Sequence, residues 1–191
     1  MQRRDVLRAF GAATALALLP HEAVAAWSRV AAGVPPIDGL TEPQLALVGA
    51  VSDIIIPRTD TPGATDVGVP AFINVIVAEN YTDTDRAAFV TGLDSLEAQA
   101  KGTGGSAFVE LAPTAQAALI ESIEGAADRR AEPSRTYWRL KGLVIHGYFT
   151  SEPVMKQVLK VEIMPGSFDG AAPMPVKVQR APSQHSSHAH G

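Results

Sequence analysis

The sequence contains no cysteine among its 191 residues. This absence excludes disulfides, zinc sites built from thiolates, iron–sulfur clusters held by thiolates and covalently attached c-type haem. It leaves the cellular compartment open, because disulfide-free proteins also occur in oxidising spaces. Strong positive charge is missing as well, since the net charge is −4. A chain without a basic footprint is not expected to bind nucleic acid.

Motifs of common enzyme classes are also missing. The sequence has no G-x-S-x-G, no P-loop and no G-x-G-x-x-G. His146 is the only histidine in the segment expected to fold, and a lone histidine on an apolar helix is usually a packed one. Glu121 and Glu124 are expected to form a solvated acidic edge, without the apolar surroundings that split carboxyl pKa values. We therefore expect no catalytic, cofactor or metal site in this chain.

The amino-terminal stretch has the organisation of an export signal. Arg3 and Arg4 precede an apolar run over residues 9–19, and Ala-Val-Ala follows at residues 23–25. This pattern predicts a signal peptide over residues 1–25. The paired arginines favour the twin-arginine route to the periplasm, with an ordinary secretory signal as the alternative. The apolar run is about half the roughly 20 residues that a membrane-spanning helix needs, so we expect no transmembrane segment.

The remaining chain predicts a linker, one folded domain and a tail. Breakers such as Pro35-Pro36 mark residues 26–40 as the linker. Residues 41–170 predict a small, irregular all-α domain of five or six helices with long loops, and the Pro- and Ser-rich residues 171–191 predict a disordered tail. The expected helices cover residues 42–56, 71–81, 83–100, 114–124 and 137–149, and a short one that Ser151 caps and that ends near Leu159.

The helix expected over residues 137–149 is apolar on most of its circumference. One face carries Tyr137, Leu140, Val144 and Tyr148. A neighbouring stripe carries Trp138, Ile145 and Phe149. We therefore expect this helix to be buried on more than one side, with Gly142 and Gly147 where another backbone approaches closely.

Two loops stand out by their turn residues. The first, over residues 58–70, contains several Asp and Thr side chains, but it lacks the ligand spacing of an EF-hand, so we expect these side chains to hold the turn backbone rather than a metal. The second covers residues 164–170 and carries Phe168, an aromatic side chain that a small loop cannot easily bury. Aromatic anchors in loops and at helix ends are typical of interface centres. The expected anchors are Tyr148, Phe149, Ile163, Met164, Pro165 and Phe168, with a core role as the alternative for Tyr148 and Phe149.

The export signal and the missing cofactor motif fit together in one way. The twin-arginine route carries folded passengers, commonly because a cofactor was inserted before export. This chain shows no motif for such a cofactor. We therefore expect a second chain that bears the cofactor and is exported together with this one.

A set of short motifs resembles the gluconate 2-dehydrogenase subunit 3 family. The motifs include Asp53-Ile54-Ile55-Ile56-Pro57, the segment 59–64 and Gly147-Tyr148-Phe149-Thr150-Ser151-Glu152. Gly68-Val69, Phe72-Ile73, Phe108, Leu111, Gln116, Leu119 and Pro165-Gly166 complete the set. The resemblance spans residues 41–170 and includes the leader. The family often has an acid where this chain has Asn74, so a role for that side chain is in doubt.

The resemblance implies a division of labour between chains. It implies that a large subunit of the glucose-methanol-choline type holds FAD and oxidises a sugar or polyol, with a cytochrome c as a candidate electron acceptor. The small subunit would bind, stabilise and export that flavoprotein and hold no cofactor itself. Two alternatives stay open: a subunit that also shapes the substrate pocket of the large subunit, and a free-standing periplasmic binding or scaffold protein.

Overall fold

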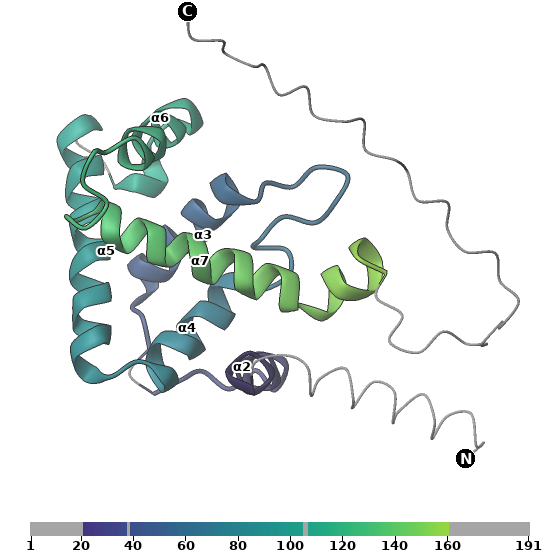
Figure 1. Ribbon diagram of the computed structural model, residues 1–191. Helices are drawn as coiled ribbons and strands as arrows, with labels where there is room; N and C mark the ends of the chain where they lie inside the picture. The colour runs from purple at the N-terminus through teal and green to yellow at the C-terminus, as the bar shows by residue number, and fades with distance from the viewer. Residues whose placement is uncertain (1–20, 38, 105–106, 161–191) are drawn as a thin grey trace, which may run out of the picture.

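The computed structural model describes residues 21–37, 39–104 and 107–160 (Figure 1). These residues form six α-helices, one 3-10 turn and one π-helical turn, and they contain no strand. The elements are α2 (His21–Ala31), α3 (Glu42–Ile55), α4 (Val69–Asn80), α5 (Asp83–Gly104), η1 (Phe108–Glu110), α6 (Pro113–Glu124), α7 (Ser134–Thr150) and η2 (Val154–Val158). The expected all-α class is confirmed. Residues 1–20 of the leader predicted over residues 1–25 lie outside the described residues, as does the predicted tail.

Short-range chemistry sets several helix ends. At the start of α3 the backbone N–H of Thr41 donates to Oε1 of Gln44 at 3.1 Å, which satisfies a donor at the helix entry. At the start of α5 the Oγ1 of Thr82 accepts from the backbone N–H of Asp85 at 3.1 Å. Pro113 occupies the first turn of α6, where its missing N–H costs nothing. These local signals explain why the helices expected from residue 42 to residue 150 are confirmed.

Helix α7 is the centre of the fold and runs across the middle of the molecule in Figure 1. It contacts α3, α4, α5, α6 and η2. The face predicted to be apolar is buried in full, with Tyr137, Leu140, Val144 and Tyr148 in the core. The neighbouring stripe is different, because Ile145 and Phe149 are exposed and Trp138 is only half-buried. The expected burial on more than one side is therefore wrong for this stripe within the described residues. No described helix is long and apolar enough to cross a membrane.

The two glycines of α7 have different surroundings. A Cβ placed on Gly147 would lie 2.7 Å from Cδ1 of Phe72, a ring that is fully buried. A Cβ placed on Gly142 would meet no atom of another described segment within 4 Å. The expected close approach of another backbone is thus wrong at both glycines within the described residues: at Gly147 a side-chain ring approaches closely, and at Gly142 no other described segment does.

Helix α2 overturns part of the predicted linker. Residues 26–31 continue this helix, and irregular chain begins only after it. The indole of Trp27 stacks on Phe72 of α4 with ring centroids 5.0 Å apart. Its Nε1–H donates to Oγ1 of Thr150, the last residue of α7, at 3.0 Å. The partners of Trp27 lie far along the chain, so no local pattern could show that this segment packs.

Ser151 lies between two helical segments: its backbone carbonyl accepts from the N–H of Met155 at 3.0 Å and so opens the next turn, but its side chain does not cap that turn. Its hydroxyl donates to the backbone carbonyl of Tyr148 at 2.8 Å, inside the last turn of α7. The following turn, η2, has no side-chain cap and adopts π-helical hydrogen bonding from Val154. The prediction that Ser151 caps a short α-helix is wrong because its hydroxyl is already used by the preceding helix.

Candidate functional site

Two apolar side chains on α7 face solvent in the described structure. Ile145 is 42% exposed and Phe149 is 47% exposed. Their spacing of four residues places them one turn apart on the same helix face. Gly142, one turn earlier, is exposed and adds no side chain. We call Gly142, Ile145 and Phe149 the α7 stripe; these exposed residues carry no polar side chain and follow one face of the central helix.

The end of the α7 stripe rests on a fixed support. The ring of Tyr148 lies edge-on to Phe149, with centroids 5.4 Å apart. Its hydroxyl donates to the backbone carbonyl of Pro62 at 2.8 Å. Pro62 belongs to the loop between α3 and α4, so this hydrogen bond ties the C-terminal end of α7 to that loop. Phe149 is therefore exposed on a rigid base, which lowers the entropy cost of a contact made through it.

The loop between α3 and α4 is held by its own acidic side chains. The Asp66 carboxylate accepts from the Arg58 guanidinium and from the backbone N–H of Gly63, and these bonds hold the pKa of Asp66 below its usual value. The Asp53 carboxylate accepts from the backbone N–H and the hydroxyl of Thr65 at 3.0 and 2.9 Å. The expected role of these side chains in holding the turn is confirmed. The described residues contain no group of three or more His, Cys, Asp or Glu that could hold a metal.

Glu124 belongs to a hydrogen-bonded cluster that joins α6 to α7. Its carboxylate accepts from the Lys141 ammonium and from the Tyr137 hydroxyl, and these bonds, Lys141 first, lower the pKa of Glu124. Burial, followed by the bond to Glu124, raises the pKa of Tyr137. The predicted solvated acidic edge therefore holds only in part for Glu124, whose side chain is 36% exposed but whose carboxylate is also paired. Near neutral pH the Glu124 carboxylate stays ionised and the Tyr137 phenol stays neutral, so the two groups do not exchange a proton. The cluster is therefore structural.

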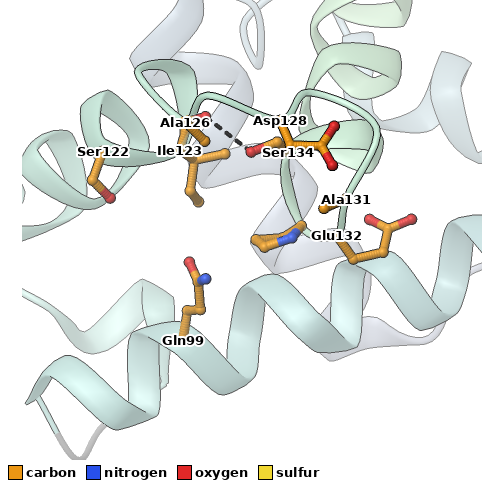
Figure 2. A pocket seen from close by; sticks show the side chains of 9 residues that line it. Gln99, Ser122, Ile123, Ala126, Asp128, Ala131, Glu132 and Ser134 are labelled. Carbon is orange, nitrogen blue, oxygen red and sulfur yellow. Dashed lines mark hydrogen bonds between the residues drawn. The ribbon is translucent and has the colours of Figure 1, made fainter.

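A hollow of about 270 Å³ lies where α5, α6 and the start of α7 meet (Figure 2). It is lined by Gln99, Ser122, Ile123, Ala126, Asp128, Ala131, Glu132, Pro133 and Ser134. The Ser134 hydroxyl donates to the backbone carbonyl of Ile123 at 3.0 Å, the dashed line in Figure 2. The Glu132 carboxylate accepts from Nε of Arg135 at 2.7 Å and from the backbone N–H of Thr136 at 3.3 Å. Both side chains are therefore engaged in structural bonds, and no base among the lining residues pairs with the serine.

Two further polar residues have structural surroundings. The imidazole of His146 is half-buried and lies 5.9 Å from the ring of Phe72, centroid to centroid, which agrees with the expected packed histidine. Oδ1 of Asn74 accepts from the backbone N–H of Leu40 at 2.7 Å. Asn74 therefore ties the segment before α3 to α4, a function that explains an acceptor at this position.

Of the residues predicted to anchor a partner, the structure describes only Tyr148 and Phe149. Tyr148 lies in the core of this chain, and Phe149 is exposed beside it. The other predicted anchors and the export residues lie outside the described residues; they are Arg3, Arg4, Ile163, Met164, Pro165 and Phe168. Sequence reasoning missed Ile145 as an exposed residue. Its position one turn before Phe149 was the available signal.

Comparison with known families supports the resemblance. The family model described as Gluconate 2-dehydrogenase subunit 3 matches residues 42–166, well over half of the chain. The match begins at the first residue of α3 and includes the loop after it and all of α7. Helix α2 precedes the matched segment. No curated protein and no solved structure matches this chain.

Proposed function

The chain belongs to the gluconate 2-dehydrogenase subunit 3 family, and we propose that it is the non-catalytic small subunit of a periplasmic FAD-dependent sugar or polyol dehydrogenase. In this proposal it binds the flavoprotein large subunit, stabilises it and carries it through the twin-arginine route. The large subunit, of the glucose-methanol-choline type, holds FAD and performs the oxidation. A cytochrome c is the candidate acceptor of the electrons.

The observation that carries the proposal is the α7 stripe. Ile145 and Phe149 lie exposed on the helix that contacts α3, α4, α5, α6 and η2 with its other faces. Single exposed apolar residues are ordinary, but an apolar pair on a rigid helix, with an aromatic ring at its end, is typical of an interface centre. A subunit of a dehydrogenase complex needs such a surface. We therefore assign the α7 stripe to an apolar pocket of the flavoprotein.

The division of chemistry between the two chains supports the same proposal. Glycine-rich dinucleotide-binding turns follow a strand and open a helix. The described residues of this chain have no strand, and the acidic groups near α7 and in the loop after α3 are engaged by protein donors. A flavin therefore fits the partner better than it fits the described part of this chain.

A docking experiment tests the surface. The chain is tagged, co-expressed with its flavoprotein, and recovered as wild type, as Ile145→Ser with Phe149→Ser, or as Val109→Ser. Val109 is a matched control, because it is 45% exposed and lies on a different element, η1, which packs on α3 and α5. Loss of a central aromatic anchor costs about 2 kcal/mol or more, so we expect the double variant to bind the flavoprotein with a Kd roughly thirty-fold higher and to retain less of it.

The outcomes separate the proposal from its alternatives. Undiminished flavoprotein on the double variant, with Val109→Ser equal to wild type, contradicts the assignment of the α7 stripe. Intact assembly with an altered KM for the sugar would favour a subunit that shapes the substrate pocket. Recovery of the wild-type chain alone, folded and without flavoprotein, would favour a free-standing binding or scaffold protein.

A second experiment addresses export. Replacing Arg3 and Arg4 by lysine removes the paired arginines but keeps the charge. We expect both this chain and its flavoprotein to remain in the cytoplasm in that variant, because the large subunit uses the leader of the small one. Flavoprotein that still reaches the periplasm would contradict the shared export.

A further inference from the structure

The predicted cleavage site lies inside a packed helix. The small-x-small pattern Ala23-Val24-Ala25 falls in α2, which spans His21–Ala31. Ala23 is 0% exposed and Ala26 is 1% exposed. One of the two small side chains that define the site is thus buried, and so is the residue after the bond between Ala25 and Ala26.

Contacts with two other helices hold α2 in place. Trp27 stacks on Phe72 of α4 and donates a hydrogen bond to Thr150 of α7. Arg29 pairs with Glu79 at 2.8 Å, near the end of α4. Figure 1 shows α2 beside α4, at the edge of the molecule, with α7 nearby. The side chains that anchor α2 on its neighbours, Trp27 and Arg29, therefore both follow the predicted cleavage site.

The same packing extends into the core through Phe72. Its ring is fully buried, carries Trp27 on one side, and fills the space that a side chain on residue 147 would need. Gly68 also lies under α2, since a Cβ there would come within 3.6 Å of Trp27 and 3.9 Å of Val30. Opening α2 therefore uncovers apolar surface of α4 as well as that of α2 itself.

A protease that reads two small side chains needs its substrate opened out of a helix. Cleavage within a folded element follows the population of its locally opened state, and that population falls as packing improves. Cleavage after Ala25 would also leave less than two turns of α2, too short to persist as a helix without the lost contact of Ala23.

We propose that docking of α2 on α4 and α7 closes the Ala25–Ala26 bond to processing, so that the leader stays attached and α2 is part of the working protein. The proposal goes beyond the small-subunit role, and its biological setting rests on the proposed export of a folded chain. A passenger that folds before it crosses the membrane presents this bond already inside a packed helix, with Ala25 exposed and Ala23 and Ala26 buried on either side of it. The contacts of Trp27 thereby decide whether the leader is kept.

Controlled proteolysis of the purified full-length chain tests the closure without reference to export. Elastase cuts after small residues, and mass spectrometry locates the cut. We expect the Ala25–Ala26 bond to resist in the wild type and in His21→Ala, whose side chain is 92% exposed on the same helix. We expect Trp27→Ala to be cut there at least ten times faster. Thr150→Val removes the acceptor for Trp27, together with the hydroxyl's own bonds to the carbonyls of His146 and Gly147 inside α7. It leaves the stacking of Trp27 on Phe72 in place, so its rate of cutting should fall between the other two.

The remaining outcomes overturn the proposal. Rapid cutting of the wild type at this bond contradicts closure, and equal resistance in all variants contradicts the role of Trp27. Circular dichroism checks that the variants stay folded, and Thr150→Val keeps the test valid if Trp27→Ala unfolds. In the exporting cell, a small subunit whose amino terminus is Ala26 would show that the leader is removed, whereas retained residues before His21 agree with the proposal. The proteolysis result stands even if the export role fails.

Discussion

Alanine at the two glycines of α7 gives a matched pair of perturbations in one helix. Both substitutions add one methyl group and both remove the entropic cost of glycine, which favours the helix by about 1 kcal/mol. Their surroundings differ. At Gly142 the new methyl group meets no other segment of the described part of the chain within 4 Å, whereas at Gly147 it would lie 2.7 Å from Cδ1 and 3.1 Å from Cε1 of Phe72.

The ring of Phe72 has little room to move. It is fully buried, and Trp27 stacks on it at 5.0 Å between centroids. Extra methyl groups in such a core cost about 1–3 kcal/mol. We therefore expect Gly142→Ala to raise the free energy of unfolding by about 1 kcal/mol and Gly147→Ala to lower it by about 1 kcal/mol.

Urea denaturation followed by circular dichroism measures the difference. In thermal melts we expect Gly142→Ala to gain and Gly147→Ala to lose about 2–4 °C in Tm. The comparison within one helix removes effects of composition and of the unfolded chain. Equal stability of the two variants would refute the packing of Phe72 against α7, and with it the layered contact of α2, α4 and α7.

Three further predictions follow from the polar contacts. The pKa of Glu124 is lower in the folded protein than in the unfolded chain, so its ionised carboxylate stabilises the fold at pH values above the pKa of an unfolded glutamate. This stabilisation is lost as the pH falls from about 5 through the pKa of Glu124 in the folded state. Lys141→Met should therefore flatten the acid limb of a plot of unfolding free energy against pH, and an unchanged limb would contradict the pairing. Tyr137→Phe should lower the free energy of unfolding, measured by urea denaturation at neutral pH, by about 1–2 kcal/mol. The substitution leaves the core packing intact and removes one hydrogen bond to a carboxylate. An unchanged free energy of unfolding would show that this bond contributes nothing to stability. Asn74→Asp should preserve the free energy of unfolding, since it keeps the acceptor for the N–H of Leu40, while Asn74→Ala should lower it by about 1 kcal/mol. Equal stability of these two variants would contradict a stabilising role for that hydrogen bond.

Local signals in the sequence were enough to predict most helices. Proline and threonine at helix starts act within one turn, as at Thr41 and Pro113. The apolar face of α7 was also predictable, because Tyr137 and Tyr148 follow the helical period and are both buried. The family could be inferred from motifs whose order matters more than any single residue.

Contacts between distant segments were the part that could not be predicted. Trp27 packs on Phe72 and bonds to Thr150, so the docking of α2 depends on residues from three helices. A breaker-rich segment with a small-x-small pattern gave no sign of this. The burial of Tyr148 and the exposure of Phe149 depend on distant contacts as well. Both side chains lie on apolar stripes of the helix, and periodicity does not show which of these stripes the rest of the fold covers.

The most direct test of the account is to purify the tagged chain from the periplasm of its own host and identify what accompanies it. The account predicts a stable complex with one flavoprotein that lacks its own export signal, with flavin absorbance that follows the large chain when the two are separated. A chain recovered alone, free of flavin and still able to oxidise a sugar or polyol, would contradict it.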